Sequence, residues 1–394
     1  MKLRIGLIGL GDLWQTRYRP ALRMLDDRFD VRAVYSTISK LAESTAAEFQ
    51  ADPIDGYRSL VYRCDIDAVL ILKQCWLGWL PALAACQAGK AVYWAAGLDF
   101  DPHRQNAVLR AIEQSGVSFM AELPRRFAPA TLRLKELIAT RLGPPRLIRV
   151  HRQSISDRTP GDAGPTACRT DDSELVELVD WCRYVVGKTP HCVTSVCEVN
   201  TFQSLMLQYD CSPDQGVIAE IATDGTLPSR WKEAASFRSP AAMKIQCENG
   251  VAFIDLPSSL VWFDDAGRHV ESLETESPVG ERMLRQFHRS VTSLVRDLGG
   301  LVDAYEAAAV VQAARQSHET GQRVMLPGGR VKGEGWCGCF RMDLARWSNL
   351  PTGQRCHLRL VGPIRLIKRD TLLCRWNQPP FPAPQTHARP VSTP

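Results

Sequence analysis

The sequence predicts an α/β fold, in which an N-terminal doubly wound parallel sheet is followed by an α+β domain with a mainly antiparallel open sheet. Three observations lead to this prediction. Apolar strand-like runs alternate with helical segments over residues 1–122. Strand-like runs then follow one another across much of residues 123–330. Residues 331–394 are basic and rich in cysteine and proline, so we expect a third part there, a tail without a packed core.

The first part opens with "LRIGLIGLG", a continuous apolar run that ends in glycines, as buried parallel strands do. We expect a helix from about Leu13, broken or kinked by Pro20. Further strands are predicted in "DVRAVYS", "IDAVLIL", "AVYW" and "VSFMAE". Helices are predicted in "SKLAESTAAEF", capped by Ser39, and in "LPALAACQAG" and "DPHRQNAVLRAIEQSG". This βαβ alternation indicates a parallel sheet with crossover helices.

The second part begins with a helix in "PATLRLKELIATRLG" and a strand in "RLIRVHRQ". An amphipathic helix follows in "SELVELVDWCRYVVG", and two more helices are expected at 279–297 and 302–320. Strands joined by short turns are typical of antiparallel sheets. Such strands are predicted in "HCVTSVCEV", "FQSLMLQY", "GVIAEIAT", "AAMKIQCENGVAFIDL" and "SLVWFDD".

Charge and hydropathy exclude several classes of protein. The chain carries a net charge of +5, but ten Lys/Arg against three Asp/Glu in residues 331–394 leave residues 1–330 at −2. A near-neutral body gives no electrostatic case for nucleic-acid binding. No apolar run approaches the roughly 20 residues of a membrane helix, and the first run lacks a cleavage site. We therefore expect a cytoplasmic protein with no membrane association.

The first strand ends in a dinucleotide-binding pattern, Gly9-x-Gly11-x-x-Trp14. In such a loop the first glycine makes the turn, and the second lets the backbone approach a pyrophosphate. The N–H groups at Gly11, Asp12 and Leu13 would then hold the phosphates. Trp14 replaces the third glycine, whose role is close packing of helix on strand. The alternative is a Rossmann sheet that binds no cofactor.

The second strand ends without the acidic residue that usually binds a ribose 2′-hydroxyl. Ser36, Thr37, Ser39 and Lys40 stand there instead, and hydroxyls beside a lysine suit a 2′-phosphate. Between NAD and NADP we therefore favour NADP. The alternative is that these residues only begin a helix and expose a lysine to solvent.

The segments "IGLGDLWQTRYRPAL", "IDAVLIL", "AACQAGKAVYW", "RRFAPATLRLKELI", "ENGVAFIDL" and "FHRSVTSLVRDL" together resemble the Gfo/Idh/MocA family, the glucose–fructose oxidoreductases and inositol dehydrogenases. The resemblance covers about residues 2–328. It implies a Rossmann domain that binds NAD or NADP, a C-terminal domain with an open sheet, and homo-oligomers formed through that sheet. It also implies a small-molecule substrate of the sugar or polyol type.

This sequence departs from the family where the chemistry is expected. The family's Glu-Lys-Pro, whose lysine lies beside the nicotinamide and substrate, corresponds to Ala95, Ala96 and Gly97. The family's Asp and His, four residues apart on the first helix of the second domain, correspond to Ser173 and Glu177, and a following Asp is kept as Asp180. A Pro and a His after the fourth strand appear as Gln74 and Gly78. The resemblance therefore implies a non-standard active site.

Other residues are candidates for the missing roles. Glu177 and Asp180 share a helix face and, with Glu122 at a strand end, could supply a general acid or base. Lys73 could replace the lost lysine or bind phosphate. The alternative is a solvated acidic face and an exposed lysine.

Substrate contacts are predicted on the same rim. Trp76 could stack on a sugar ring, as could Trp79 and Trp94, although these aromatics could equally fill the core. Of Arg125 and Arg126 we expect one to face the cleft, where it could bind an anionic substrate, and the other to pair on the surface. We select Arg126 for the cleft.

No metal site is predicted. Tail residues could bind zinc, but their spacing fits no common zinc geometry. These are Cys337, Cys339, Cys356, His357 and Cys374. Two functions stay open: an NAD(P)-dependent oxidoreductase with a rebuilt site, and a non-catalytic dinucleotide- or metabolite-binding regulatory or scaffold protein.

Overall fold

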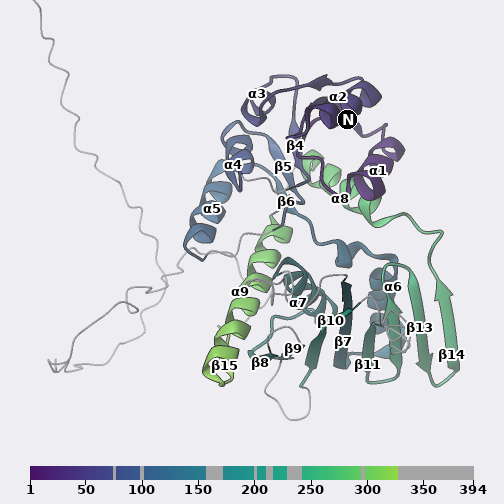
Figure 1. Ribbon diagram of the computed structural model, residues 1–394. Helices are drawn as coiled ribbons and strands as arrows, with labels where there is room; N and C mark the ends of the chain where they lie inside the picture. The colour runs from purple at the N-terminus through teal and green to yellow at the C-terminus, as the bar shows by residue number, and fades with distance from the viewer. Residues whose placement is uncertain are drawn as a thin grey trace, which may run out of the picture. The chain divides into compact units, whose positions relative to one another are not determined.

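The computed structural model of the chain (Figure 1) describes residues 1–73, 77–97, 102–156, 172–198, 202–209, 216–228, 242–293 and 298–326. The expected tail, 331–394, lies outside these residues. None of the helices in the described part combines the length and apolarity that crossing a membrane requires.

The N-terminal sheet consists of six parallel strands in the order β3-β2-β1-β4-β5-β6, as the βαβ alternation predicts. The strands are β1 Leu3–Ile8, β2 Phe29–Tyr35, β3 Asp52–Pro53, β4 Ala68–Ile71, β5 Ala91–Trp94 and β6 Phe119–Ala121. The helices are η1 Trp14–Tyr18, α1 Arg19–Met24, α2 Ser39–Phe49, α3 Tyr57–Val61, α4 Leu80–Gln87 and α5 Pro102–Ser115. The short elements β3 and α3 were not anticipated, because two to five residues carry too little periodicity.

Two local predictions need correction. Ser39 is the first helical residue of α2 rather than its cap, since the N-cap is Ile38 and no side chain bonds the helix end. The helix expected from about Leu13 begins as a π-helical turn, in which the N–H of Tyr18 donates to the carbonyl of Leu13 at 3.3 Å. Pro20 then lies in the first turn of α1, where its missing N–H costs nothing.

The second sheet has nine strands in the order β14-β13-β12-β11-β7-β10-β9-β8-β15. Its neighbours are antiparallel except β7 and β10, which pair in parallel. The strands are β7 Pro145–Ser156, β8 Cys192–Glu198, β9 Phe202–Gln208, β10 Ile218–Pro228, β11 Met243–Cys247, β12 Val251–Asp255, β13 Ser259–Asp264, β14 Gly267–Ser272 and β15 Val324–Met325. The sequence pattern does not predict β14 and β15, because β14 is polar and β15 has only two residues.

The helices that follow β6 are η2 Pro124–Phe127, α6 Pro129–Leu137, η3 Ile138–Leu142, α7 Asp172–Val186, α8 Val279–Thr292 and α9 Gly299–Thr320. Of these, α6, α7 and α9 cover one face of the second sheet. Apolar side chains of α6, α7 and α9 form one buried cluster with the inward residues of β7–β13. Figure 1 shows α7 and α9 against the strands β7 to β10.

The last two helices also return to the N-terminal sheet. Met283, Leu284 and Phe287 of α8 are buried with β1, α1 and α2. Leu301 and Ala304 at the start of α9 are buried on the sheet's other face, with α4 and α5. In Figure 1, α8 lies beside α1, although nearly the whole folded chain separates them in sequence. The carboxyl ends of β5 and β6 lie close to the first turns of α7, since residues of all three line one cavity.

Candidate functional site

The glycine loop after β1 has the geometry that its pattern predicts. Gly9 has φ +72°, a left-handed conformation, and a Cβ there would lie 2.9 Å from the carbonyl oxygen of Lys73. A Cβ on Gly11 would lie 3.0 Å from the carbonyl oxygen of Leu72. Both glycines are therefore required for the loop to pack against the end of β4. Among the described residues, the N–H groups of Gly11, Asp12 and Leu13 donate to no backbone carbonyl.

Trp14 does not obstruct this loop. Its side chain is 2% exposed and packs against Phe49 of α2, with ring centroids 6.0 Å apart. The π-helical turn that begins at Trp14 widens the chain path directly after the loop. The indole thus fills the space between η1 and α2, away from the glycine loop.

The two other residues predicted to bind cofactor lie at the end of β2. Ser36 accepts a hydrogen bond from the N–H of Ile38 at 3.3 Å, which shapes the turn into α2. Lys40 is exposed in the first turn of that helix. Both follow the strand next to the glycine loop, because β2 pairs with β1 along its whole length. Both therefore lie at the loop's edge of the sheet.

Lys73 belongs to the glycine loop. Its Nζ donates to Oδ1 of Asp12 at 3.3 Å, and both side chains are largely exposed. Lys73 is not among the residues lining the two cavities described below. This position suits phosphate contact better than proton transfer in the cleft.

The loop Ala95–Gly97, where the resemblance led us to expect the catalytic lysine, is apolar, and its middle residue is buried. Ala96 is 8% exposed and belongs to the core cluster that contains Trp94 and Trp79. The indoles of Trp79 and Trp94 stack with centroids 4.2 Å apart, and the Trp94 N–H donates to the carbonyl of Gly97. The two tryptophans are therefore core residues, which was the alternative left open, whereas Trp76 lies outside the described residues.

A small cavity of about 170 Å³ lies between this loop and α7. Trp94, Ala95 and Gly97 form one wall, and the chain after β6 forms another. The remaining lining residues come from the helix after the glycine loop and from α7: Leu13, Arg17, Ser173, Val176 and Glu177.

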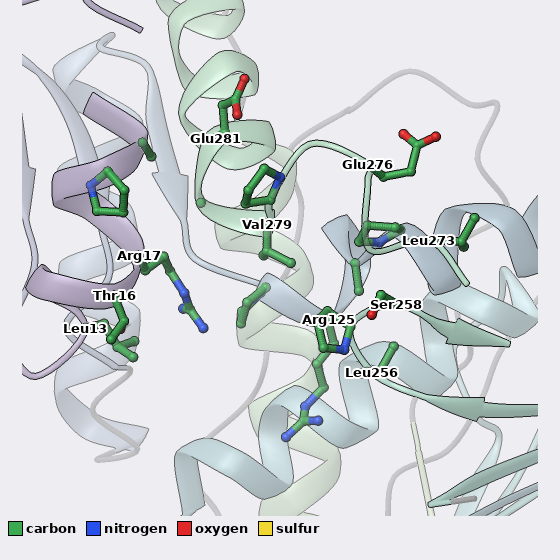
Figure 2. Close-up of a pocket in the computed structure, with 18 of the residues that line it drawn as sticks. Leu13, Thr16, Arg17, Arg125, Leu256, Ser258, Leu273, Glu276, Val279 and Glu281 are labelled. Atoms are coloured by element: carbon green, nitrogen blue, oxygen red, sulfur yellow. The ribbon is translucent and has the colours of Figure 1, made fainter. Parts of the chain in front are cut away.

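A second cavity of about 780 Å³ adjoins it and shares Leu13, Arg17, Pro124 and Glu177 as lining residues. Figure 2 shows Arg17 reaching into this cavity from the helix that carries Leu13 and Thr16, with Val279, Leu273 and Ser258 across from it. The side chain of Arg17 is paired with Glu122 at the end of β6. Arg17 was not predicted as a site residue, although it lies one turn into the helix that follows the glycine loop.

Glu177 is the candidate acid or base with the most suitable surroundings. It lies on α7 and lines both cavities. Burial raises the pKa of its carboxyl from 4.5 to about 7, although Arg125, whose Nε lies 3.3 Å from Oε2, lowers it. Nearby Glu122 raises it further. A carboxyl with a pKa near 7 can both accept and donate a proton at neutral pH.

Asp180 and Arg126, which were predicted to act in the cleft, lie in a buried ion network instead. Arg126 donates to Asp180 through Nε at 2.7 Å and to Asp303 through Nη1 at 2.6 Å, and its guanidinium lies over the ring of Tyr184. Asp180 is 1% exposed and also lies 3.8 Å from Arg183. Neither Asp180 nor Arg126 lines a cavity described here. These groups form a buried ion network that joins η2, α7 and α9.

The arginine that faces the cleft is Arg125. It lines the larger cavity and pairs with Glu177 and, at 3.0 Å, with Glu174. The sequence could not distinguish the two arginines, because both stand in one 3₁₀ turn and only the tertiary partners differ.

The residues present fit a dinucleotide. The glycine loop leaves no room for side chains, its N–H groups are directed to no backbone acceptor among the described residues, and Trp14 is buried elsewhere. Gly9, Gly11, Asp12 and Leu13 would hold the pyrophosphate.

Comparisons with known proteins agree with this geometry. Residues 3–122 match the model of the GFO_IDH_MocA family, described as an oxidoreductase family with an NAD-binding Rossmann fold. The chain is 23% identical over 188 residues to the uncharacterized oxidoreductase YrbE of Bacillus subtilis. That match spans 46% of this chain and about half (53%) of the length of YrbE.

Solved structures share the fold. Myo-inositol 2-dehydrogenase from Lactobacillus plantarum is 17% identical with a TM-score of 0.63, over 83% of this chain and 100% of that one. An NAD binding oxidoreductase from Klebsiella pneumoniae is 18% identical with a TM-score of 0.66, over 84% of this chain and 100% of that one. A super-repressor mutant of Gal80p from Saccharomyces cerevisiae is 14% identical with a TM-score of 0.66, over 82% of this chain and 98% of that one. Residues 3–122 thus match an oxidoreductase family with an NAD-binding Rossmann fold, and the solved structures share the fold of most of the chain.

Proposed function

We propose that the chain is an NAD(P)-dependent oxidoreductase that interconverts a hydroxyl and a carbonyl group on a sugar- or polyol-like substrate, with Glu177 as its acid and base. The observation that carries this proposal is the position of Glu177, which lines both cavities with a pKa raised to about 7 by burial. It occupies the place where the family has a histidine, so a titratable group is kept there.

The proposed chemistry divides between cofactor and chain. When bound, the dinucleotide supplies a hydride acceptor or donor. The carboxylate of Glu177 takes the proton of the substrate hydroxyl as the carbon loses its hydride, and the protonated carboxyl returns it in the reverse direction. Arg125, 3.3 Å from Glu177, stabilises the carboxylate once the proton has left. The Ala95–Gly97 wall contributes no proton donor and excludes water.

NADP is the proposed cofactor. Lys40 is exposed at the start of α2, beside Ser36, and could pair with a 2′-phosphate. Fluorescence titration with NADPH and NADH tests this. We expect the wild type to bind NADPH about tenfold more tightly, which corresponds to about 1.4 kcal/mol. Lys40→Ala should lose that preference, while Lys2→Ala, at the opposite edge of the sheet, should keep it.

Turnover is tested separately, by the loss of NADPH absorbance with a panel of ketoses and inososes. We expect consumption by the wild type and at least about a hundredfold less by Glu177→Gln, in the range of general acid–base contributions. No saturable binding of either dinucleotide up to about millimolar concentration would refute the proposal.

A second candidate function is dinucleotide binding without turnover. The burial of Ala96 supports it, because the position of the family lysine is part of the core. The fold shared with the Gal80p super-repressor also supports it. Saturable NADPH binding without consumption of any panel member would favour this candidate over the first.

We also propose that the chain forms homo-oligomers through the open sheet. Val196, Met206 and Ile218 lie on neighbouring strands and are 37–61% exposed, on the face that α7 and α9 leave uncovered. Light scattering should show a dimer or a larger assembly. Met206→Lys should shift the assembly toward the monomer. A wild type that is already monomeric would contradict this proposal.

A further inference from the structure

The larger cavity is formed by segments far apart in the sequence. One wall is the helical face of Leu13, Thr16, Arg17, Pro20 and Met24; the others are the chain at 124–129, the β12–β13 turn and the link from β14 to α8 (Figure 2). Its volume of about 780 Å³ lies within the roughly 300–1,000 Å³ of small-molecule sites. The family match at residues 3–122 covers only the first of these walls.

The walls are mainly apolar. Leu13 and Met24 are 41% and 69% exposed, so two large apolar side chains of this helix face solvent. Pro20 and Pro278 also line the cavity, and Figure 2 shows Leu273 and Val279 across from Leu13. A ligand that covers these side chains removes apolar surface from water and gains affinity.

The two cavities adjoin each other at shared lining residues. Leu13, Arg17, Pro124 and Glu177 line both of them. The inner cavity, about 170 Å³, is smaller than the roughly 300 Å³ at which ligand pockets begin. A substrate whose reacting hydroxyl approaches Glu177 therefore has to extend into the larger cavity.

The charges of the site disfavour an anionic ligand. Arg17 is paired with Glu122, and Arg125 with Glu174 and Glu177. The cavity is also lined by glutamates at 274, 276 and 281, of which the last two pair with Arg282 and Arg285. Each arginine that lines the cavity thus has a carboxylate partner, and glutamates outnumber arginines among the lining residues.

We propose that the substrate is a neutral glycoside-like compound, with its reacting hydroxyl in the inner cavity and an apolar aryl or alkyl substituent in the larger cavity. This inference rests on the proposed function, because Glu177 defines the reacting end. It assigns the larger cavity as the subsite for the substituent and excludes free sugars as the best ligands.

Calorimetry on the NADPH-bound protein tests the proposal. The probes are matched methyl and phenyl β-D-glycosides of glucose, galactose and mannose, with phenyl β-D-glucuronide as the anionic counterpart. For each sugar that binds, we expect the phenyl glycoside to bind at least about tenfold more tightly than the methyl glycoside. The glucuronide should bind more weakly than the phenyl glucoside.

Two variants locate the subsite. Thr16→Trp places an indole in the larger cavity. Met24→Trp narrows the outer part of that cavity, and Met24 is itself exposed. Both should lose the phenyl preference. Gln15→Trp is the matched control, since Gln15 is an exposed neighbour on the same helix that does not line the cavity.

The outcomes separate this inference from the proposed function. Equal affinity for methyl and phenyl glycosides, a phenyl preference that both cavity variants keep, or no glycoside binding at about millimolar concentration would each overturn the inference. Hydride transfer is scored independently, by NADP reduction with the phenyl glycosides that bind. A phenyl preference without any NADP reduction would support the subsite and contradict the proposed hydride transfer.

Discussion

Replacing Glu177 by glutamine should remove a specific pH dependence of stability. Burial raises the pKa of Glu177 from 4.5 to about 7 in the folded state. The folded protein therefore binds more protons than the unfolded chain between these two pH values. Stability then falls as the pH rises through this window, and the loss is complete above about pH 7.

The magnitude follows from the same pKa values. A rise from 4.5 to about 7 corresponds to about 3 kcal/mol if none of it is screened. The side chain is 31% exposed, so we expect roughly 1–2 kcal/mol after solvent screening. The stability of Glu177→Gln minus that of the wild type should thus be greater at pH 8 than at pH 5 by about this amount. The charged groups that face Glu177 are Arg125, Glu122, Arg17 and Asp180, and both proteins retain them.

Urea unfolding followed by tryptophan fluorescence, at about pH 5, 6, 7 and 8, measures this difference. Glu136→Gln, an exposed glutamate of α6, is the control and should follow the wild type. A stability difference between Glu177→Gln and wild type that is equal at pH 5 and pH 8 would refute a carboxyl titrating near neutrality. The proposed acid–base role would then lose its physical basis.

Three further substitutions test the site. Gly9→Ala puts a Cβ 2.9 Å from the Lys73 carbonyl oxygen, at a backbone φ of +72°. It should cost about 1–3 kcal/mol of stability and at least tenfold in NADPH affinity. An unchanged NADPH titration would contradict the loop assignment. Ala96→Lys buries an ammonium group in an apolar cluster, so we expect a lower melting temperature and no gain in NADPH consumption, whereas a gain would show that this position opens to the cleft. Arg126→Met leaves Asp180 buried without its main partner and should cost about 3–5 kcal/mol in urea unfolding, clearly more than Arg125→Met; equal losses would argue against the buried network.

The sequence alone predicted the elements that depend on local pattern. The helix in "SKLAESTAAEF" coincides with α2, Ser39–Phe49, and the strand in "AVYW" coincides with β5. The order of strands and helices in residues 1–122 predicted the parallel sheet, because crossover connections leave few alternatives. The positions of Gly9 and Gly11 were also readable, since their role depends on a short pattern after a strand.

Tertiary structure decided the rest of the site. Arg125 and Arg126 are neighbours with the same chemistry, and their roles differ only because Arg126 meets Asp180 and Asp303, 54 and 177 residues away. Trp14 is compatible with the glycine loop only because Phe49 offers a packing partner on α2. The larger cavity exists because α8 returns to the N-terminal sheet and brings Val279 opposite Leu13. Periodicity and short motifs report on a chain's nearest neighbours, whereas ion pairs and cavities depend on which distant segments pack together.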